Sequence, residues 1–341
     1  MSLSERATLE AGRRLLDLPD GVLRRLFGRP PPAAEGLDQQ AWALARLSEF
    51  GAPAEPPSDM ETRRQTELRC AVFGAAPETP VVAADLDAGG VPARLYVPQA
   101  AGGPGPLLVF FHGGGWVQGS IQSHDIGCRT VADRAGVRVL SVEYRLAPEH
   151  PFPAAFDDAV SAYTAVVRDP ERFGAATVAV GGDSAGGNLA ATLSLHARDA
   201  GLPVPAFQWL LYPVTDAPDR HDTYEAYAEG FYLTAERMRY LFERYVPDSA
   251  ERDDPRVAPL RAADLSGLPP AFVATCLADP LRAEGEAYAR RLEEAGATVE
   301  MRREPLVHGY LNATALRSGR AGVLRAADSL RRGLARAPVR G

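Results

Sequence analysis

A serine framed by glycines is the residue best suited to nucleophilic chemistry in this chain. Ser184 lies in the run G-D-S-A-G at 182–186, between the β-branched segment 177–180 and an Ala- and Leu-rich segment. This G-x-S-x-G pattern between a strand and a helix is typical of a sharp turn that exposes the serine hydroxyl. The glycines are needed because a side chain beside such a turn collides with neighbouring backbone. Alone, the pattern also fits a turn without chemistry or a phosphate-binding loop. Whether Ser184 is a nucleophile therefore depends on the residues that could act with it.

A triple glycine is the second feature that favours such chemistry. An exposed serine is a weak nucleophile at neutral pH, and it needs a base, an acid that orients the base, and N–H donors for the oxyanion. The run H-G-G-G-W at 112–116 follows the apolar segment Leu107–Phe111 and leaves backbone N–H groups free to point inward. Hydrolases with such a loop combine it with the N–H of the residue after the nucleophile. We therefore predict an oxyanion hole formed by Gly113, Gly114 and Ala185.

The base is sought among six histidines. His308 follows the segment 298–304, the last strand expected in the chain, and a loop there can carry an imidazole to Ser184. The chain order serine, acid, histidine accompanies this kind of turn. We therefore predict His308 as the base. The remaining candidates are His112, His124, His150, His196 and His221.

Two aspartates compete for the role of the acid. Asp279 follows the apolar segment Ala271–Cys276, and Asp216 follows the segment Phe207–Tyr212. An aspartate before a proline, as at 279, also fits an ordinary helix N-cap. We favour Asp279 because the last two strands are expected to be neighbours, which brings its loop beside that of His308. A buried carboxylate there would hold the histidine tautomer and stabilise the imidazolium.

The spacing of apolar residues changes along the chain, and it predicts the helices and strands that position these side chains. Residues 1–75 are predicted to form a helical cap, with helices up to residue 19 and over 22–27, 37–50 and 58–73, and a Pro-rich turn between the last two. A hairpin over 81–97 follows, and strands then alternate with helical segments of about 15 residues. This alternation predicts a catalytic domain over 76–341 with an α/β fold: a mostly parallel sheet, helices on both faces, and antiparallel strands at one edge.

The segment 216–265 interrupts the alternation, because it is long, charged and rich in aromatic residues. We predict that it forms a second helical insertion over the same end of the sheet as the serine. Large aromatic residues pack in the core more often than they line a pocket. Four of them are nevertheless candidates for the substrate pocket: Trp116, Tyr212, Phe231 and Tyr232.

Composition excludes several classes of protein. The 341 residues carry a net charge of −7, which argues against a nucleic-acid partner. Three cysteines without a C-x-x-C or metal-ligand spacing fit a reduced cytosolic protein, and neither a Walker-type loop nor an H-E-x-x-H motif is present. No apolar run approaches the roughly 20 residues of a membrane span, and the charged N-terminus argues against a signal peptide. We expect a cytoplasmic protein without cofactor or metal that acts on a small molecule, and a homodimer stays open.

Four blocks of sequence together resemble the hormone-sensitive-lipase-like family of microbial carboxylesterases in the α/β-hydrolase superfamily. They are H-G-G-G-W at 112–116, Y-R-L-A-P-E-H-P-F-P at 144–153, G-D-S-A-G-G-N at 182–188, and D-P-L-R at 279–282 with H-G at 308–309. The resemblance implies a triad of Ser184, Asp279 and His308, a lid of N-terminal helices, and hydrolysis of short-to-medium acyl esters without a cofactor.

The chain departs from the family pattern at two places near the acid. Ala283 stands where the family usually has a second aspartate, and Cys276–Ala278 stands where an aromatic or acidic residue is more common. Both departures can change the support around Asp279 or the shape of the pocket. Two alternatives share the same residues: an amidase or acyl-transferring enzyme, and a non-catalytic ligand receptor on this fold. Loss of the base would favour the receptor, and His308 is present.

Overall fold

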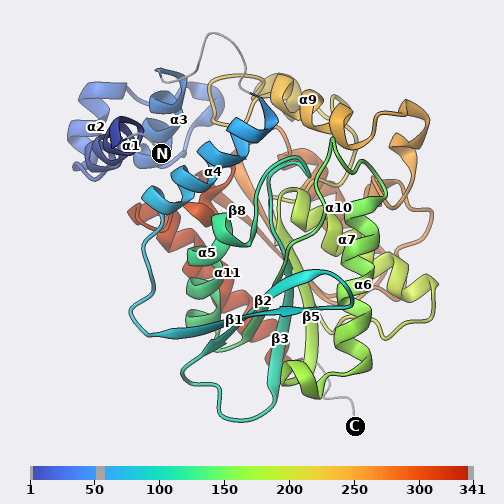
Figure 1. Cartoon of the computed structure of the whole chain (residues 1–341). Coiled ribbons are helices and arrows are strands. Elements are labelled where there is room, and N and C mark those ends of the chain that lie inside the picture. The colour runs from blue at the N-terminus through green and yellow to red at the C-terminus, as the bar shows by residue number, and fades with distance from the viewer. Residues whose placement is uncertain (1–2, 51–57, 337–341) are drawn as a thin grey trace.

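The alternation of apolar and amphipathic segments folds into one sheet between two layers of helices (Figure 1). The computed structural model describes residues 3–50 and 58–336; the predicted Pro-rich turn lies outside them. The strands are β1 (Val81–Asp87), β2 (Pro92–Pro98), β3 (Gly105–Phe111), β4 (Arg138–Val142), β5 (Ala175–Asp183), β6 (Gln208–Leu211), β7 (Ala271–Ala278) and β8 (Val299–Val307). The helices are α1 (Leu3–Leu16), α2 (Asp20–Phe27), α3 (Gln39–Phe50), α4 (Asp59–Phe73), α5 (Ile121–Ala135), α6 (Ala154–Arg168), α7 (Ala185–Asp199), α8 (Thr223–Ala226), α9 (Ala235–Tyr245), α10 (Arg282–Glu294) and α11 (Arg317–Arg336).

The sheet has the strand order β1-β2-β4-β3-β5-β6-β7-β8. β1 pairs antiparallel with β2, and β2 pairs antiparallel with β4. The remaining neighbours are parallel. The predicted α/β fold with antiparallel strands at one edge is therefore confirmed. Parallel strands all end at the same edge, so β5, β7 and β8 deliver the residues that follow them to one end of the sheet.

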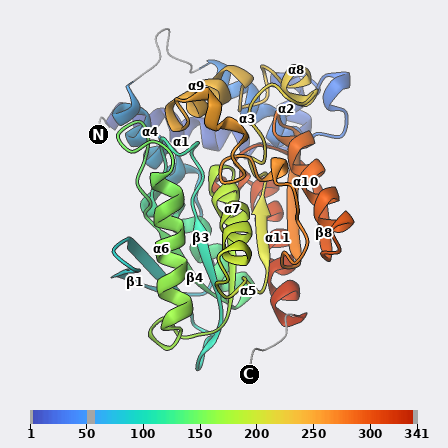
Figure 2. The same cartoon turned by 90° about the vertical axis from the view of Figure 1, so that its right-hand side faces the viewer.

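Helices cover both faces of the sheet and bury its central strands. In Figure 1, α6, α7 and α10 lie on one side and α5 and α11 on the other, and Figure 2 shows the first group in front of the strands. Strands covered on both faces are mostly apolar. Accordingly, every residue of β4 and β6 is buried, as are the last five residues of β3.

The N-terminal helices α1–α4 lie over the end of the sheet at which Ser184 is found (Figure 1). Arg63 of α4 attaches them to the catalytic part of the chain. Its guanidinium donates to the carbonyl oxygens of Val117 at 2.7 Å and Ala147 at 2.9 Å, and it pairs with Glu149 at 2.6 Å. The described chain changes from helix to strand between Phe73 and Val81. The domain boundary at residues 75 and 76 stays a prediction.

The segment 216–265 also covers this end of the sheet, but much of it is irregular. Its one long helix is α9, and the rest consists of the short α8, 3₁₀ turns at Ser249–Asp253 and Pro259–Arg261, and loops. α9 meets α4 where the hydroxyl of Tyr240 donates to Asp59 Oδ1 at 2.7 Å. Among the described residues, no helix is both long and apolar enough to cross a membrane.

Candidate active site

The turn between β5 and α7 holds Ser184 in a strained backbone conformation. Its φ is 54° and its ψ is −118°, a region that costs a non-glycine residue about 1–3 kcal/mol. The flanking glycines are sterically required. A Cβ at Gly186 would lie 1.8 Å from the carbonyl oxygen of Phe111, and one at Gly182 would lie 2.4 Å from the backbone of Gly186. The turn thus presents a serine hydroxyl at the end of the sheet and at the N-terminus of α7.

Ser184, His308 and Asp279 form a continuous hydrogen-bonded chain. His308 Nε2 lies 2.9 Å from Ser184 Oγ, and His308 Nδ1 lies 2.8 Å from Asp279 Oδ2. All three side chains are buried. Because β7 and β8 are parallel neighbours, the loop carrying Asp279 lies beside the loop carrying His308. Asp279 Oδ1 also accepts the N–H of Leu281 at 2.9 Å, so the same carboxylate supports the turn that leads into α10.

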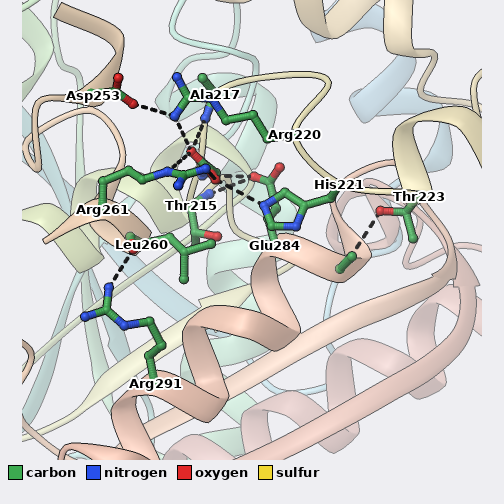
Figure 3. Close-up of polar contacts among 12 residues, drawn as sticks. Thr215, Ala217, Arg220, His221, Thr223, Asp253, Leu260, Arg261, Glu284 and Arg291 are labelled. Carbon is green, nitrogen blue, oxygen red and sulfur yellow. Dashed lines mark hydrogen bonds and ion pairs between the residues drawn. The ribbon is translucent and has the colours of Figure 1, made fainter.

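The rival acid, Asp216, belongs to a separate cluster of charges. Its carboxylate binds Arg220 at 3.0 Å, His221 at 3.1 Å and Arg261 at 2.6 Å. Figure 3 shows these three cationic or ionisable side chains converging on one point. Although burial alone raises the pKa of Asp216, the hydrogen bonds from His221 and Arg261 lower it well below the usual range. The carboxylate of Asp216 thus binds these three side chains instead of His308, as expected if Asp279 orients the base.

The glycine loop departs from the prediction at its first residue. The N–H of Gly113 donates to Asp183 Oδ1 at 2.8 Å, so it cannot also face an oxyanion, and its predicted role is wrong. Within the described part of the chain, the N–H groups of Gly114, Gly115 and Ala185 have no hydrogen-bond acceptor. Both Gly114 and Gly115 line the same cavity as Ser184. The donors available to an oxyanion are therefore shifted by one residue along the loop.

Asp183 and His124 form a buried pair that the sequence did not predict. His124 Nε2 lies 3.2 Å from Asp183 Oδ1, and Asn312 Nδ2 lies 3.0 Å from the same ring nitrogen. Burial alone raises the pKa of Asp183, but the charge and hydrogen bond of His124 and the N–H of Gly113 lower it below the usual range. The pair connects the serine turn, the glycine loop and α5. His124 borders no strand end, and its position in the first turn of α5 gives no other signal in the sequence.

His112, the first residue of the glycine loop, is fixed within the protein. Its ring stacks on Tyr144 with 4.2 Å between centroids, and its carbonyl oxygen accepts the hydroxyl of Tyr144 at 2.7 Å. Burial, with the neighbouring His124, lowers the pKa of His112 to about 3. A neutral, enclosed imidazole shapes the loop and cannot reach the serine as a base.

A cavity of about 610 Å³ opens over the serine. Its walls include Ser184, His308, the glycine loop, α4, the start of α9 and the segment 229–234. Of the four aromatic residues predicted to line the pocket, Tyr232 does so. The other three predictions are wrong, because these side chains pack in the core. Trp116 stacks on Tyr245 with 4.2 Å between centroids, Tyr212 packs beneath His308 at 4.6 Å, and Phe231 packs against Trp42 at 5.9 Å.

No group of three or more His, Cys, Asp or Glu side chains is arranged to hold a metal ion in the described parts, 3–50 and 58–336. The cysteines do not form such a site either: Cys128 and Cys276 are buried and Cys70 is half-buried, and all three are free thiols.

Comparisons with known proteins show which family the chain resembles. Residues 108–312 match a family described by the α/β-hydrolase fold. The chain is 47% identical over 243 residues to the carboxylic ester hydrolase LipN of Mycobacterium tuberculosis, covering 69% of this chain and 64% of LipN, slightly under two thirds of that protein. It is 39% identical over 251 residues to an ethyl acetate hydrolase of Pseudomonas putida, covering 71% and 79% of the two chains. The crystal structure of a thermostable esterase from Pseudomonas putida superposes with a TM-score of 0.83 at 33% identity, covering 90% of this chain and 99% of that one.

Proposed function

The chain belongs to the hormone-sensitive-lipase-like carboxylesterases of the α/β-hydrolase family, and we propose that it cleaves short-to-medium acyl esters through Ser184, His308 and Asp279. The observation that carries this proposal is the hydrogen-bonded chain of 2.9 Å and 2.8 Å that joins these three side chains. The order and spacing match the roles of nucleophile, base and orienting acid.

In the proposed reaction, Ser184 Oγ attacks the ester carbonyl carbon while His308 Nε2 accepts the hydroxyl proton. The imidazolium that forms is stabilised by Asp279, which is buried and faces Nδ1. The tetrahedral intermediate collapses as His308 returns the proton to the leaving alkoxide oxygen, which leaves an acyl group on Ser184. His308 then deprotonates a water molecule that attacks the acyl carbon, and the acid is released with the serine regenerated.

The negative charge of both tetrahedral intermediates requires donors that are already in place. We assign this role to the N–H groups of Gly114, Gly115 and Ala185. Loss of a single donor of this kind typically costs about 10²–10³-fold in kcat. The contact of Gly113 with Asp183 supports the assignment. It engages the first N–H of the loop, whereas the N–H groups of the next two residues, which also line the cavity, have no acceptor within the described part of the chain.

A short acyl group suits the space beside the base. A second cavity, of about 50 Å³, borders on His308 and Gly309. Its apolar walls are formed by Ala41, Leu44, Phe73, Leu306, Ala313 and Leu316. A space of this size and polarity favours a small alkyl chain. A relative named for the hydrolysis of ethyl acetate, the ester of a two-carbon acid, points in the same direction.

The test is hydrolysis of p-nitrophenyl esters of increasing acyl length, with p-nitroanilides of the same acids beside them. We expect turnover of the esters with a maximum at short-to-medium acyl length, little turnover of the anilides, and a loss of at least about 10³-fold in Ser184→Ala. A wild-type protein that is inert on every ester would overturn the proposal and favour a ligand receptor. Anilide turnover that exceeds ester turnover would favour the amidase alternative.

A further inference from the structure

Two arginines line the cavity that contains Ser184. Arg69 projects from the last turns of α4, and Arg237 projects from the first turn of α9. These two helices approach the serine from different parts of the chain and meet above it (Figure 1). Both covering segments therefore contribute a guanidinium group to the cavity that contains the serine.

Arg69 lies next to the loop that carries the base. Its Nη1 donates to the hydroxyl of Tyr232 at 3.3 Å. The ring of Tyr232 in turn packs against Gly309, where a Cβ would lie 3.5 Å from Tyr232 Cε1. One tyrosine ring thus separates the guanidinium of Arg69 from the residue after His308.

Arg237 lies next to the glycine loop on the other side of the cavity. Its Nη2 donates to Gln118 Oε1 at 3.4 Å, and Gln118 donates its own N–H to the carbonyl oxygen of Gly114 at 3.1 Å. The guanidinium also lies over the ring of Tyr240, 4.9 Å from its centroid. Arg69 and Arg237 thus line the same cavity as Ser184, one beside the loop of the base and the other beside the glycine loop.

Neither arginine has a carboxylate partner within 4.0 Å among the described residues, whereas their neighbours on the same helices do. On α4, Arg63 pairs with Glu149, and Arg64 pairs with Glu61. On α9, Arg239 pairs with Asp219. Arg244 of α9 likewise has no ion pair within the described part of the chain, but it does not line the cavity and lies over the ring of Tyr240.

The two guanidinium groups are also close enough to repel one another. Burial, to which the charge of Arg69 adds, lowers the pKa of Arg237. Four carboxylates also line the cavity, and none of them forms an ion pair with either arginine. Asp183 faces His124, Glu49 pairs with Arg46, and Glu229 and Glu236 are exposed. Two unpaired guanidinium groups around one cavity form a ready site for an anion, and planar guanidinium groups suit a carboxylate in particular.

We propose that the preferred ester carries a carboxylate away from the scissile bond, and that Arg69 and Arg237 bind this carboxylate. The inference rests on the proposed esterase function and specifies its substrate class, an acidic ester such as a half-ester of a dicarboxylic acid or an ester of a hydroxy acid. The arginines supply binding energy remote from the reacting atoms, so their effect falls mainly on KM.

The experiment compares matched pairs of esters in the full chain. For an anionic acyl group, mono-p-nitrophenyl glutarate is compared with p-nitrophenyl pentanoate. For an anionic alcohol, 4-(acetoxymethyl)benzoate is compared with benzyl acetate. We expect kcat/KM to favour the anionic member of one pair by about tenfold or more, the range of one charge-assisted hydrogen bond, and this preference to weaken at high salt.

Substitutions show whether the two arginines cause the preference. Arg69→Gln and Arg237→Gln should each lower the anionic-to-neutral ratio by about tenfold through KM, and Arg69→Lys and Arg237→Lys should restore part of it. Arg239→Gln, on the same helix as Arg237 but paired with Asp219, is the matched control and should leave the ratio unchanged. Thermal melting checks that each variant is folded.

Two results would overturn the inference, and they differ in what else they overturn. Hydrolysis of the neutral esters with no preference in either pair, or with a preference that survives both glutamine variants, rejects the anion site and leaves the esterase function intact. Failure to hydrolyse any of the four esters rejects the esterase function and this inference with it.

Discussion

At the scale of single residues, Asp183 joins the two loops on which the proposed mechanism depends. Its carboxylate accepts the N–H of Gly113 at 2.8 Å and faces His124 at 3.2 Å. Asp183 directly precedes Ser184, so one buried side chain fixes the glycine loop relative to the nucleophile. The backbone donors and the nucleophile are thereby held at a set separation, which is the condition for stabilising an oxyanion.

Removal of this carboxylate should therefore lower kcat more than it raises KM. We expect Asp183→Ala to lose about 10²-fold in kcat, the range seen when an oxyanion donor is displaced. Asp183→Asn keeps an oxygen acceptor for Gly113 and should recover much of the loss. The measurement is steady-state hydrolysis of p-nitrophenyl acetate, with thermal melting as the folding control. An unchanged kcat in Asp183→Ala would show that the loop does not depend on this contact.

Substitution of the two candidate acids should have very different effects on esterase activity. Asp279→Asn should reduce kcat by about 10⁴-fold, because an amide favours the wrong histidine tautomer and cannot stabilise the imidazolium. Asp216→Asn should keep most of its activity and lower the melting temperature, since Arg220, His221 and Arg261 lose a charged partner. The ester assay and thermal melting of both variants check this. The reverse pattern of activities would reject Asp279 as the acid.

At this scale, the sequence predicted which strand-end residues lie together, and it did not predict contacts that depend on the orientation of side chains. Ser184, Asp279 and His308 each follow a strand, so sheet topology alone brings them together. The contact of Gly113 with Asp183 joins two loops and depends on side-chain geometry that no local pattern encodes. The prediction that Trp116 lines the pocket failed for a similar reason. The sequence does not show whether an aromatic residue faces a cavity or stacks on another ring in the core.

The elements around the acid form a buried support. Glu284, in the first turn of α10, accepts the N–H of Thr215 at 2.8 Å and of Asp216 at 3.3 Å through Oε1, and Figure 3 shows it beside Thr215. It thereby attaches the helix that follows Asp279 to the loop that follows β6. Burial, to which the charges of Asp216 and Asp279 add, raises the pKa of Glu284 well above its usual range, despite the two backbone donors.

This raised pKa makes the stability of the protein depend on pH in a defined direction. The unfolded carboxyl titrates near about 4.3, so folding takes up a proton between that pH and the folded pKa, and stability falls as the pH rises through this window. Glu284→Gln does not titrate and should gain stability relative to the wild type between about pH 5 and about pH 8. Asp216, with a lowered pKa, loses its contribution only at more acidic pH. Melting curves of both proteins across this range provide the measurement, and parallel pH profiles would contradict the prediction.

Helices and strands whose apolar residues recur with a regular period were predicted from the sequence, whereas irregular segments were not. The strands and the helices around the serine turn lie where apolar runs and capping residues predicted them. Each of these elements buries one side or both, so its apolar residues recur with a regular period. The segment 216–265 was predicted as a helical insertion, but much of it consists of short turns held by pairs such as Arg261 with Asp216. These pairs join residues from different turns, so they leave no periodic signal.

On the scale of the whole molecule, the proposed function assigns the reacting groups to the sheet and selectivity to the covering segments. The sheet and the serine turn follow the fold shared with the esterase of known structure. The cavity above them is closed by α4 from the N-terminal helices and by α9 from the segment 216–265. The proposed preference for acidic esters therefore resides in the covering segments, and it can change without changing the catalytic residues.

The central claim is that ester cleavage proceeds through a covalent intermediate on Ser184. The most direct test is reaction with diethyl p-nitrophenyl phosphate, followed by mass spectrometry of the digested protein. The account predicts stoichiometric release of p-nitrophenol, loss of esterase activity, and a diethylphosphoryl group on the peptide that contains Ser184, with no labelling of that peptide in Ser184→Ala. Labelling at another residue, or esterase activity that survives complete labelling of Ser184, would contradict it.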